Sequence, residues 1–405
     1  MLLLYALLQA TCTSPISPTA MTKQLSVIIT RFPYESVLSG EEWHTITLAE
    51  KLRERGHHVA FYGSCPVLLA ELGKRDFPVH KAVSGPVPVR ARSLLGFLFA
   101  SPYLKITWGL GLWRLKRRYR LSTVYMHSLS EKLLLTAWAR MFGLRVVWVE
   151  HQRWGKWMFG NPLRFLYRIL ANYVEIIGVS PQYKEAFAKL GVPEKRTHLI
   201  TNGIDLSVFH PDVTPLPLGN NAYHLGCIAR LSVDKGVDVL LQAFSALDTT
   251  VLDKPVHLHL IGEGPLRATL EAQIRDFQLE GRVHLYVPYG TIPRSDTPRF
   301  MKALDVFLLP SALPDPFGLV AAESMAVGTA TIVTNACGIR SLLSKDRDSI
   351  IVPAGNSQEL TRAITKLLTN TKEREALALA GAKTAKEHFS LDTMVDLYLQ
   401  VFTAQ

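Results

Sequence analysis

Short apolar runs alternate with helical patterns along most of this chain. Patterns with helical spacing are clearest at 41–55, 131–142 and 182–190. Strands that alternate with helices form a parallel sheet covered by helices on both faces, so the fold class is predicted to be α/β with doubly wound parallel sheets. The predicted strands lie at 25–30, 59–62, 123–126, 145–149 and 175–179, and again at 223–229, 257–261, 282–287, 305–309, 330–333 and 350–352.

A stretch rich in Gly, Asn and Pro separates the two series of strands. It begins at 202–205 (NGID), continues through the prolines of 211–217 and ends at 219–221 (GNN). At 405 residues the chain is longer than one hydrophobic core usually supports. We therefore expect two domains, 21–208 and 209–390, that face a central cleft. Ligands are expected at the carboxyl ends of the strands.

Residues 1–20 are expected to lie outside the fold. Residues 1–11 are apolar but lack the positive segment of a signal peptide and are too short to span a bilayer. Met21 directly precedes the first clear strand. We interpret 1–20 as an extension or a mis-called start, without ordered structure.

Charge is distributed unevenly between the two halves of the chain. Residues 1–205 hold 27 Lys/Arg against 13 Asp/Glu, and residues 206–405 hold 18 against 21. This asymmetry indicates an anionic partner for the first half, and since no nucleic-acid module is evident, a phospholipid surface or a phosphorylated acceptor is expected rather than nucleic acid. The four cysteines form no C-x-x-C pair, so neither a zinc site nor a disulfide framework is expected, and a cytoplasmic location fits best.

The segment 315–323 (DPFGLVAAE) places two carboxylates eight positions apart across a predicted strand-to-helix turn. Pro316 and Gly318 mark the turn, and the amides of the following helix would face an anion. Glu323 is expected about two turns into an otherwise apolar helix, where a carboxylate needs a partner. The alternative is structural: Asp315 caps the helix with Pro316 at its first position, and Glu323 is solvated.

Further candidates follow other predicted strands. Arg230 and Lys235 come after 223–229 and could clamp a diphosphate from either side, or be solvated loop cations. The turn Gly262, Glu263, Gly264 would let a ligand approach the backbone, or serve only as a tight turn. The first strand is not followed by G-x-G-x-x-G and no Walker motif is present, which disfavours a dehydrogenase and a P-loop kinase.

A histidine follows the strand 145–149 in the first half. His151 would lie where a ligand held by the opposite domain ends, although a lone histidine is as often structural. This position makes it a candidate for contact with the reacting end of the ligand.

With these residues, the chain from 24 to 405 resembles the retaining GT-B glycosyltransferases of family 4. The likeness rests on the D-x7-E element at 315–323, on the A-R-L-x-x-x-K-G run at 229–236 and, more weakly, on the loop at Gly40. It implies two Rossmann-like domains, the first binding the acceptor and the second a nucleotide sugar, with 391–405 crossing back to the first. The implied donor-site residues are Gly40, Gly262, Glu263, Gly264, Phe317, Gly318, Leu319 and Glu323, and the implied catalytic residues are His151, Arg230, Lys235 and Asp315.

The resemblance also assigns roles. Arg230 and Lys235 would hold the donor diphosphate, Asp315 the hydroxyls of the transferred sugar and Glu323 the nucleotide ribose. His151 would approach the sugar from the opposite domain. The backbone at 317–319 would meet sugar and phosphate.

Three departures from the family pattern concern these positions. Asp315 replaces a glutamate, which shortens its reach by one methylene. Ser39 replaces the first of two glycines, and Ser341 replaces a glutamate.

The implied reaction moves a hexosyl unit from a nucleotide-diphosphate sugar to a saccharide or lipid-linked saccharide, with retention, in cell-surface polysaccharide or glycolipid synthesis. Fixed cations and helix amides would stabilise the departing diphosphate, so no metal or other cofactor is expected. Two alternatives stay open: a nucleotide-sugar epimerase of the same fold, and a catalytically silent sugar-binding homologue.

The segment 85–121 combines many Leu and aromatic residues with a basic run. This composition is typical of an interfacial segment on anionic lipid, and a long core helix with a charged end is the alternative. Glycines 96, 109 and 111 and Pro102 are expected to break any single helix here. An interfacial segment would place the protein on the inner face of the cytoplasmic membrane. The candidate membrane or acceptor residues are Trp113, Arg114, Lys116, Arg117, Arg118 and Arg120.

Overall fold

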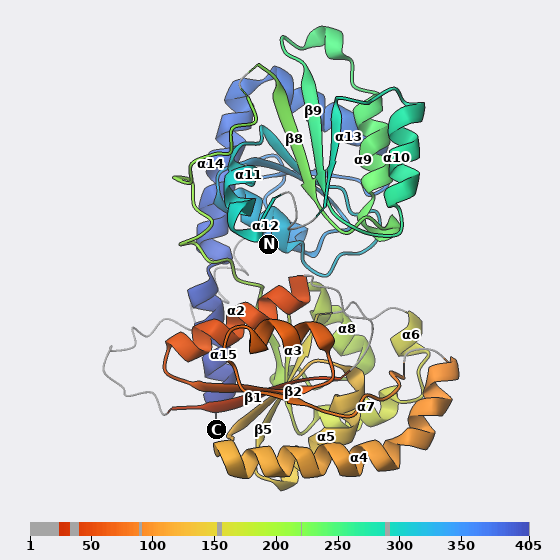
Figure 1. Ribbon diagram of the computed structural model, residues 1–405, viewed down its shortest axis with the longest axis vertical. Coiled ribbons are helices and arrows are strands. Elements are labelled where there is room, and N and C mark those ends of the chain that lie inside the picture. Colours follow the sequence, from red (N-terminus) through yellow and green to blue (C-terminus); the bar gives the residue numbers. More distant parts are fainter. Residues whose placement is uncertain are drawn as a thin grey trace.

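The computed structural model describes residues 24–32, 40–88, 91–151, 156–219, 221–287 and 292–404. Two α/β domains lie one above the other (Figure 1). The expectations for residues 1–20 and for Ser39 fall outside the described residues. The predicted fold class is confirmed, because each domain is built on one parallel sheet with helices around it.

The first sheet has seven strands in the order β3-β2-β1-β4-β5-β6-β7. β3 and β7 were not predicted, since each is a three-residue edge strand with no fully buried position. The bounds are β1 Ser26–Arg31, β2 His58–Gly63, β3 Val79–Lys81, β4 Thr123–Met126, β5 Arg145–Glu150, β6 Glu175–Gly178 and β7 Thr197–Leu199.

The second sheet has six strands in the order β10-β9-β8-β11-β12-β13. All six fall within two residues of the predicted runs. The bounds are β8 Tyr223–Ile228, β9 Val256–Ile261, β10 Val283–Tyr286, β11 Val306–Leu309, β12 Ala330–Thr334 and β13 Ile350–Val352.

Helices cover both sheets. In the first domain they are α2 Gly40–Glu54, α3 Pro66–Gly73, α4 Ala91–Tyr119, α5 Leu129–Met141, α6 Lys156–Phe159, α7 Arg164–Ala171 and α8 Gln182–Leu190. In the second they are α9 Val237–Ser245, α10 Arg267–Asp276, α11 Thr297–Lys302, α12 Leu319–Ala326, α13 Ser357–Thr369 and α14 Thr371–His388, followed by α15 Leu391–Thr403.

Two connections between the domains run side by side. Ile204, after β7, forms a parallel bridge with Ser390, between α14 and α15. α15 then enters the first domain (Figure 1), where Leu391, Val395 and Tyr398 are buried in its core. Two segments of the chain therefore connect the domains, rather than a single linker.

The prediction that glycines and Pro102 break the segment 85–121 is wrong. Ala91–Tyr119 is one continuous helix of 29 residues. Pro102 has no N–H to give to the carbonyl of Leu98, and the Ser101 hydroxyl donates to that oxygen instead, at 2.9 Å. A neighbouring hydroxyl thus replaces the hydrogen bond that the proline removes.

The glycines of α4 are packing positions. A Cβ on Gly111 would lie 2.0 Å from the hydroxyl of Tyr62, and one on Gly109 would lie 2.8 Å from Nε1 of Trp138. The missing side chains let α4 approach β2 and α5 closely. Within the described residues, no helix combines the length and the apolar character needed to cross a bilayer.

Candidate active site

Each sheet has one point where the strand order reverses, and ligands of doubly wound sheets bind in the crevice there. In the first sheet this point lies between β1 and β4, and in the second between β8 and β11. Arg31 ends β1, and His127 follows β4; Lys235 follows β8, and Asp315 follows β11. In each domain, side chains that follow the two flanking strands therefore gather at the switch point.

A cavity of about 500 Å³ opens between the domains. Gln182 and Tyr183 of α8 line it from the first domain. Pro316, Asn335 and Arg340 line it from the second. Pro316 belongs to the predicted turn, so the D-x7-E element borders an interdomain cavity.

Lys235 and Asp315 form an ion pair at the second switch point. Nζ of Lys235 lies 2.6 Å from Oδ2 of Asp315, which also accepts from the Ser311 hydroxyl at 3.2 Å. Burial alone would lower the pKa of Lys235, but the charge of Asp315 outweighs this effect and raises it. Lys235 therefore stays a cation while lying largely inside the protein.

The turn that follows Asp315 differs in detail from the prediction. Oδ1 of Asp315 accepts from the amide of Phe317 at 3.3 Å, whereas the N-cap of α12 is Gly318, with φ +98°. A Cβ on Gly318 would lie 3.0 Å from a methyl of Leu309. Since α12 begins at Leu319, Pro316 is not its first residue and Glu323 lies in its second turn, not after two full turns.

Glu323 is buried, and its partner is Arg294. The guanidinium of Arg294 donates to both carboxylate oxygens, with Nη1 3.2 Å from Oε2 and Nη2 closer to Oε1. Arg294 lies in a short 3-10 helix, Arg294–Asp296, before α11. The expectation that this carboxylate needs a partner is confirmed, and a solvated Glu323 is excluded.

Arg230 does not share a partner with Lys235. Its side chain is 55% exposed, and Nη2 lies 3.2 Å from Oδ2 of Asp234. The two cations therefore hold different carboxylates in this structure, with Arg230 at the surface and Lys235 inside.

The glycines of the turn after β9 have a structural explanation. A Cβ on Gly262 would lie 2.0 Å from the carbonyl oxygen of Ala229, and one on Gly264 would lie 2.3 Å from that of Leu231. They make room for the neighbouring backbone, and the approach of a ligand to this turn stays a prediction. Glu263 pairs with Arg267 at 3.1 Å.

His151 lies in a buried group of three imidazoles at the first switch point. Its ring stacks on His127 at 5.5 Å between centroids and meets His44 edge-on at 4.7 Å. Burial lowers the pKa of His151 to about 3 and that of His127 to about 4. Both rings are therefore neutral near pH 7. Nε2 of His151 is buried and has no hydrogen-bond partner among the described residues.

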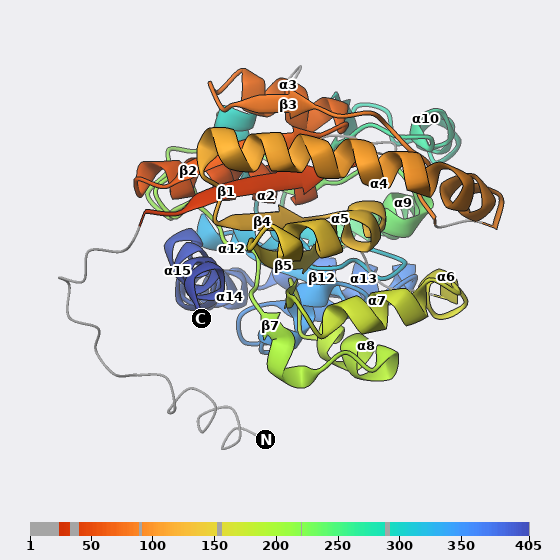
Figure 2. The ribbon, with the colours of Figure 1, turned by 90° about the horizontal axis from the view of Figure 1, so that it is seen from below.

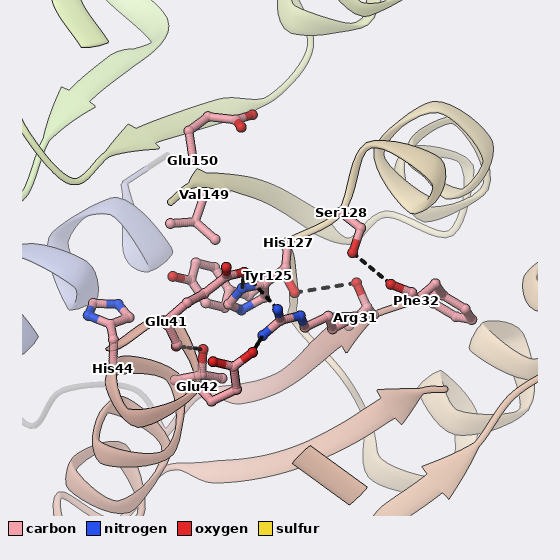
Figure 3. A network of polar contacts seen from close by, with 12 residues as sticks. Arg31, Phe32, Glu41, Glu42, His44, Tyr125, His127, Ser128, Val149 and Glu150 are labelled. Atoms are coloured by element: carbon pink, nitrogen blue, oxygen red, sulfur yellow. Dashed lines mark hydrogen bonds and ion pairs between the residues drawn. The ribbon is translucent and has the colours of Figure 1, made fainter. Parts of the chain in front are cut away.

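A charged network holds this group in place (Figure 3). Arg31 pairs with Glu42 at 2.6 Å and with Glu41 at 3.4 Å, and Oε1 of Glu41 lies 3.7 Å from Nδ1 of His127. Burial alone would raise the pKa of Glu41, but His127 and Arg31 hold it well below its usual range. Gly40, the first residue of α2, is exposed, with open space where a Cβ would stand.

Some residues of the site were not predicted from the sequence. His127 was missed although the strand before it was predicted, because a histidine after a strand is no distinctive signal. Arg294 was missed because nothing around it in the sequence marks it. The switch-point rule could have pointed to Arg31 and His127 only with a strand order, which was not predicted from the sequence.

The other predicted positions lie as follows. Phe317 is buried and meets Phe389 edge-on at 5.7 Å, and Leu319 is half-buried at the start of α12. The hydroxyl of Ser341 donates to the carbonyl of Gly338 at 2.9 Å. In the part of the chain that the structure describes, no three His, Cys, Asp or Glu side chains are arranged to hold a metal ion.

The fold and the two switch-point clusters define a protein of GT-B architecture, with two Rossmann-like domains. The family model described as Glycosyltransferase Family 4 matches residues 38–208, and the one described as Glycosyl transferases group 1 matches residues 215–384. Together they cover most of the chain, which therefore belongs to the family 4, group 1 glycosyltransferases.

Individual relatives agree with this assignment. The chain is 29% identical over 178 residues to the lipopolysaccharide core biosynthesis glycosyltransferase LpsE of Rhizobium meliloti, covering 44% of this chain and 49% of LpsE. It is 25% identical over 293 residues to the GDP-mannose-dependent alpha-(1-6)-phosphatidylinositol monomannoside mannosyltransferase of Mycolicibacterium smegmatis, covering 69% and 74% of the two chains. The chain thus spans about half the length of several curated relatives that it matches.

A solved structure shows the same fold. Anabaena Alr3699/HepE in complex with UDP superimposes with a TM-score of 0.78 at 19% identity, covering 94% of this chain and all of HepE. Both domains therefore follow the GT-B arrangement.

Proposed function

We propose that this protein transfers a hexosyl unit from a nucleotide-diphosphate sugar to a saccharide or lipid-linked saccharide, with retention of configuration. The observation that carries the proposal is the Lys235–Asp315 pair at the second switch point, beside the N-terminus of α12. Lys235 and the first amides of α12 would face the diphosphate, and Asp315 the hydroxyls of the sugar. Glu323 would accept hydrogen bonds from the ribose.

In the proposed step, the bond between the anomeric carbon and the diphosphate oxygen breaks. The acceptor oxygen bonds to that carbon on the same face, and the acceptor's proton leaves with the diphosphate. Negative charge grows on the leaving group, so a fixed cation and oriented amides stabilise the transition state without a metal ion. The neutral His151 would face the sugar from the first domain, where its unpaired Nε2 could hydrogen-bond a hydroxyl.

The surface of α4, far from the cleft, supports the proposal that the acceptor is lipid-linked. α4 lies along the side of the first domain that is turned away from the second domain (Figure 1). Its outer face carries no acidic residue and exposes seven large apolar side chains, with Phe99 85% exposed. The exposed apolar residues of α4 are Leu95, Leu98, Phe99, Tyr103, Ile106, Leu110 and Trp113.

Basic side chains continue this face toward the end of α4. Arg117 stacks over Trp113 at 4.5 Å, and Arg114, Arg118 and Arg120 are exposed nearby. Lys116 is half-buried and donates to the carbonyl of Phe142. A shallow cavity of about 580 Å³, lined by Trp113, Lys116, Arg117 and Arg120, would accept an anionic headgroup.

α5 and α7 extend the same side of the domain, as Figure 2 shows. α7 exposes Phe165, Leu166 and Ile169, and Tyr173, just after this helix, is exposed as well. Apolar side chains fringed by arginines are typical of a surface that rests in the interface of an anionic bilayer. We infer that the protein docks through this side on the inner face of the cytoplasmic membrane, and the named substrate of the Mycolicibacterium relative, a phosphatidylinositol mannoside, agrees with a lipid acceptor.

Nucleotide release from a panel of UDP- and GDP-sugars tests the reaction. A transferase releases the nucleoside diphosphate in proportion to added acceptor, such as a lipid-linked saccharide in vesicles. An epimerase that hydrolyses the sugar–diphosphate bond with water would release it with no acceptor present. Binding of a nucleotide sugar without any release would instead favour a silent homologue, and retention is read from the anomeric configuration of the product.

A further inference from the structure

Arg294 joins the candidate nucleotide site to the opposite domain. Its guanidinium holds both oxygens of Glu323 on α12. The same guanidinium lies 5.3 Å from the ring centroid of Trp43, on α2 of the first domain, and 5.4 Å from that of Phe209 in the connection between domains. One side chain therefore contacts the second domain, the first domain and the connection between them.

We propose that Arg294 is a positioning residue that couples nucleotide binding at Glu323 to the placement of α2 in the first domain. The proposal rests on the proposed function, in which Glu323 binds the ribose. Arg294 orients the carboxylate and, through Trp43, holds α2 against the nucleotide site.

The hydrogen-bonding capacity of Glu323 lets it accept from a ligand while Arg294 is in place. A carboxylate has about four lone-pair directions, and a bidentate arginine uses one on each oxygen. One direction on each oxygen is left, which matches two adjacent ribose hydroxyls. Arg294 also supplies the charge that makes a buried carboxylate tolerable, because an unpaired one is costly. Both effects favour nucleotide binding, so Arg294 assists it rather than competing with it.

α2 connects this contact to the imidazole group. Nε2 of His44, the residue after Trp43, lies 3.0 Å from the hydroxyl of Tyr398 on α15, and its ring touches that of His151. Farther along α2, Nζ of Lys51 lies 3.6 Å from Oδ2 of Asp205 in the connection between domains. Because α2 is a single helix, a shift at Trp43 is transmitted to His44, and through it to His151.

Titration calorimetry with UDP and with GDP, as free nucleotides, tests the coupling. We expect Arg294→Gln to raise the Kd of the bound nucleotide roughly tenfold. Trp43→Leu, which removes a cation–π contact but keeps an apolar side chain, should raise it about three- to fivefold. The double variant should bind no more weakly than Arg294→Gln alone, since both changes break one chain of contacts.

Matched variants separate a loss of this coupling from a general loss of stability. Arg75→Gln removes a second arginine that lies over Trp43, at 5.7 Å, and does not touch Glu323, so nucleotide affinity should stay at the wild-type value. Arg294→Lys keeps a charge and should recover part of the affinity lost in Arg294→Gln, at an unchanged melting temperature. Additive effects of Trp43→Leu and Arg294→Gln would overturn the coupling, as would tighter binding by Arg294→Gln.

The same titration distinguishes the two proposals. If the wild-type protein binds neither nucleotide, the proposed function itself fails. If the wild type binds a nucleotide and both single variants bind it equally well, only the role of Arg294 is refuted.

Discussion

Nζ of Lys235 and Oδ2 of Asp315 lie 2.6 Å apart although 80 residues separate them in the chain. Lys235 belongs to the turn after β8, and Asp315 to the turn after β11, which is the neighbouring strand of the sheet. The pair therefore fastens two βα turns together at the point where strand order reverses. A cation fixed by such a pair does not need to be reoriented when charge develops on a bound ligand.

Replacing Lys235 with methionine should abolish most of the proposed transferase activity. Removal of one preorganised group that stabilises developing charge lowers turnover by roughly 10²- to 10³-fold. The variant should also lose about 2 kcal/mol of stability, because Asp315 stays buried without its partner and Lys235 is itself partly exposed. Product formation and urea unfolding measure the two effects.

A second variant separates these two losses. In Lys235→Met with Asp315→Asn, no unpaired charge is left inside, so most of the stability should return while turnover stays low. Turnover near the wild-type rate in Lys235→Met would show that the ammonium does not act on the departing diphosphate.

The sequence predicts the turn at 315–318 better than it predicts the contacts around that turn. Asp315, Pro316 and Gly318 lie close together in the chain, so the strand, turn and helix signals fall in one short stretch of sequence. The need of Glu323 for a partner also follows from its apolar helix, but the identity of Arg294 does not. That contact forms only when η4, the 3-10 helix Arg294–Asp296, packs on α12.

The wrong prediction that glycines would break α4 has a related cause. Gly109 and Gly111 weaken a helix when considered alone, and their neighbours Trp138 and Tyr62 come from distant parts of the chain. Packing against those side chains offsets the low helix propensity. The edge strands β3 and β7 were not predicted because a partly exposed strand of three residues shows no apolar run in the sequence.

Reversing the charge at the end of α4 should release the protein from anionic vesicles. Each arginine near such a surface contributes about 1 kcal/mol, so Arg117, Arg118 and Arg120 changed to glutamate should weaken binding by at least roughly a hundredfold. Cosedimentation with vesicles containing phosphatidylglycerol measures this. Nucleotide affinity should not change, because α4 lies far from the cleft (Figure 1).

A control with the same change in net charge tests whether the location matters. Arg347, Arg362 and Lys383 are exposed in the second domain, and their replacement by glutamate should leave vesicle binding close to that of the wild type. Equal loss in both triple variants would attribute the binding to net charge alone. Retention of vesicle binding by the α4 variant would refute the docking surface.

Acid should destabilise the second domain through a group of histidines on one face of its sheet. His259 of β9 lies within hydrogen-bond distance of His224 and Tyr286, and His284 of β10 stacks beside it. Burial, followed by the nearby histidines, lowers the pKa of His259 to about 3. The unfolded chain binds this proton near pH 6.5, so the stability is full above that pH and is lost as the pH falls toward 3.

The variant His259→Gln should therefore flatten the dependence of stability on pH. Its free energy of unfolding should change by about 1.4 kcal/mol less per pH unit between pH 6 and 4 than that of the wild type. Urea midpoints across this range give the slopes. His388→Gln removes a histidine outside the group as a comparison, and a wild-type slope in His259→Gln would contradict the assignment.

Two glycines of α4 should respond oppositely to the same substitution. The Cβ of Gly111→Ala would lie 2.0 Å from the hydroxyl of Tyr62, which is buried, so the helix or the tyrosine must move, at a cost of about 1–3 kcal/mol. Gly96 is exposed, and its Cβ would meet only Pro86, at 3.8 Å. Alanine has the higher helix propensity, so Gly96→Ala should stabilise the protein by about 0.5–1 kcal/mol. Thermal melts of the two variants provide the comparison, and stabilisation of both would mean that Gly111 is not a contact position. A fall in stability for Gly96→Ala would instead mean that α4 is not continuous at its first turns, because only a helical backbone gains from alanine there.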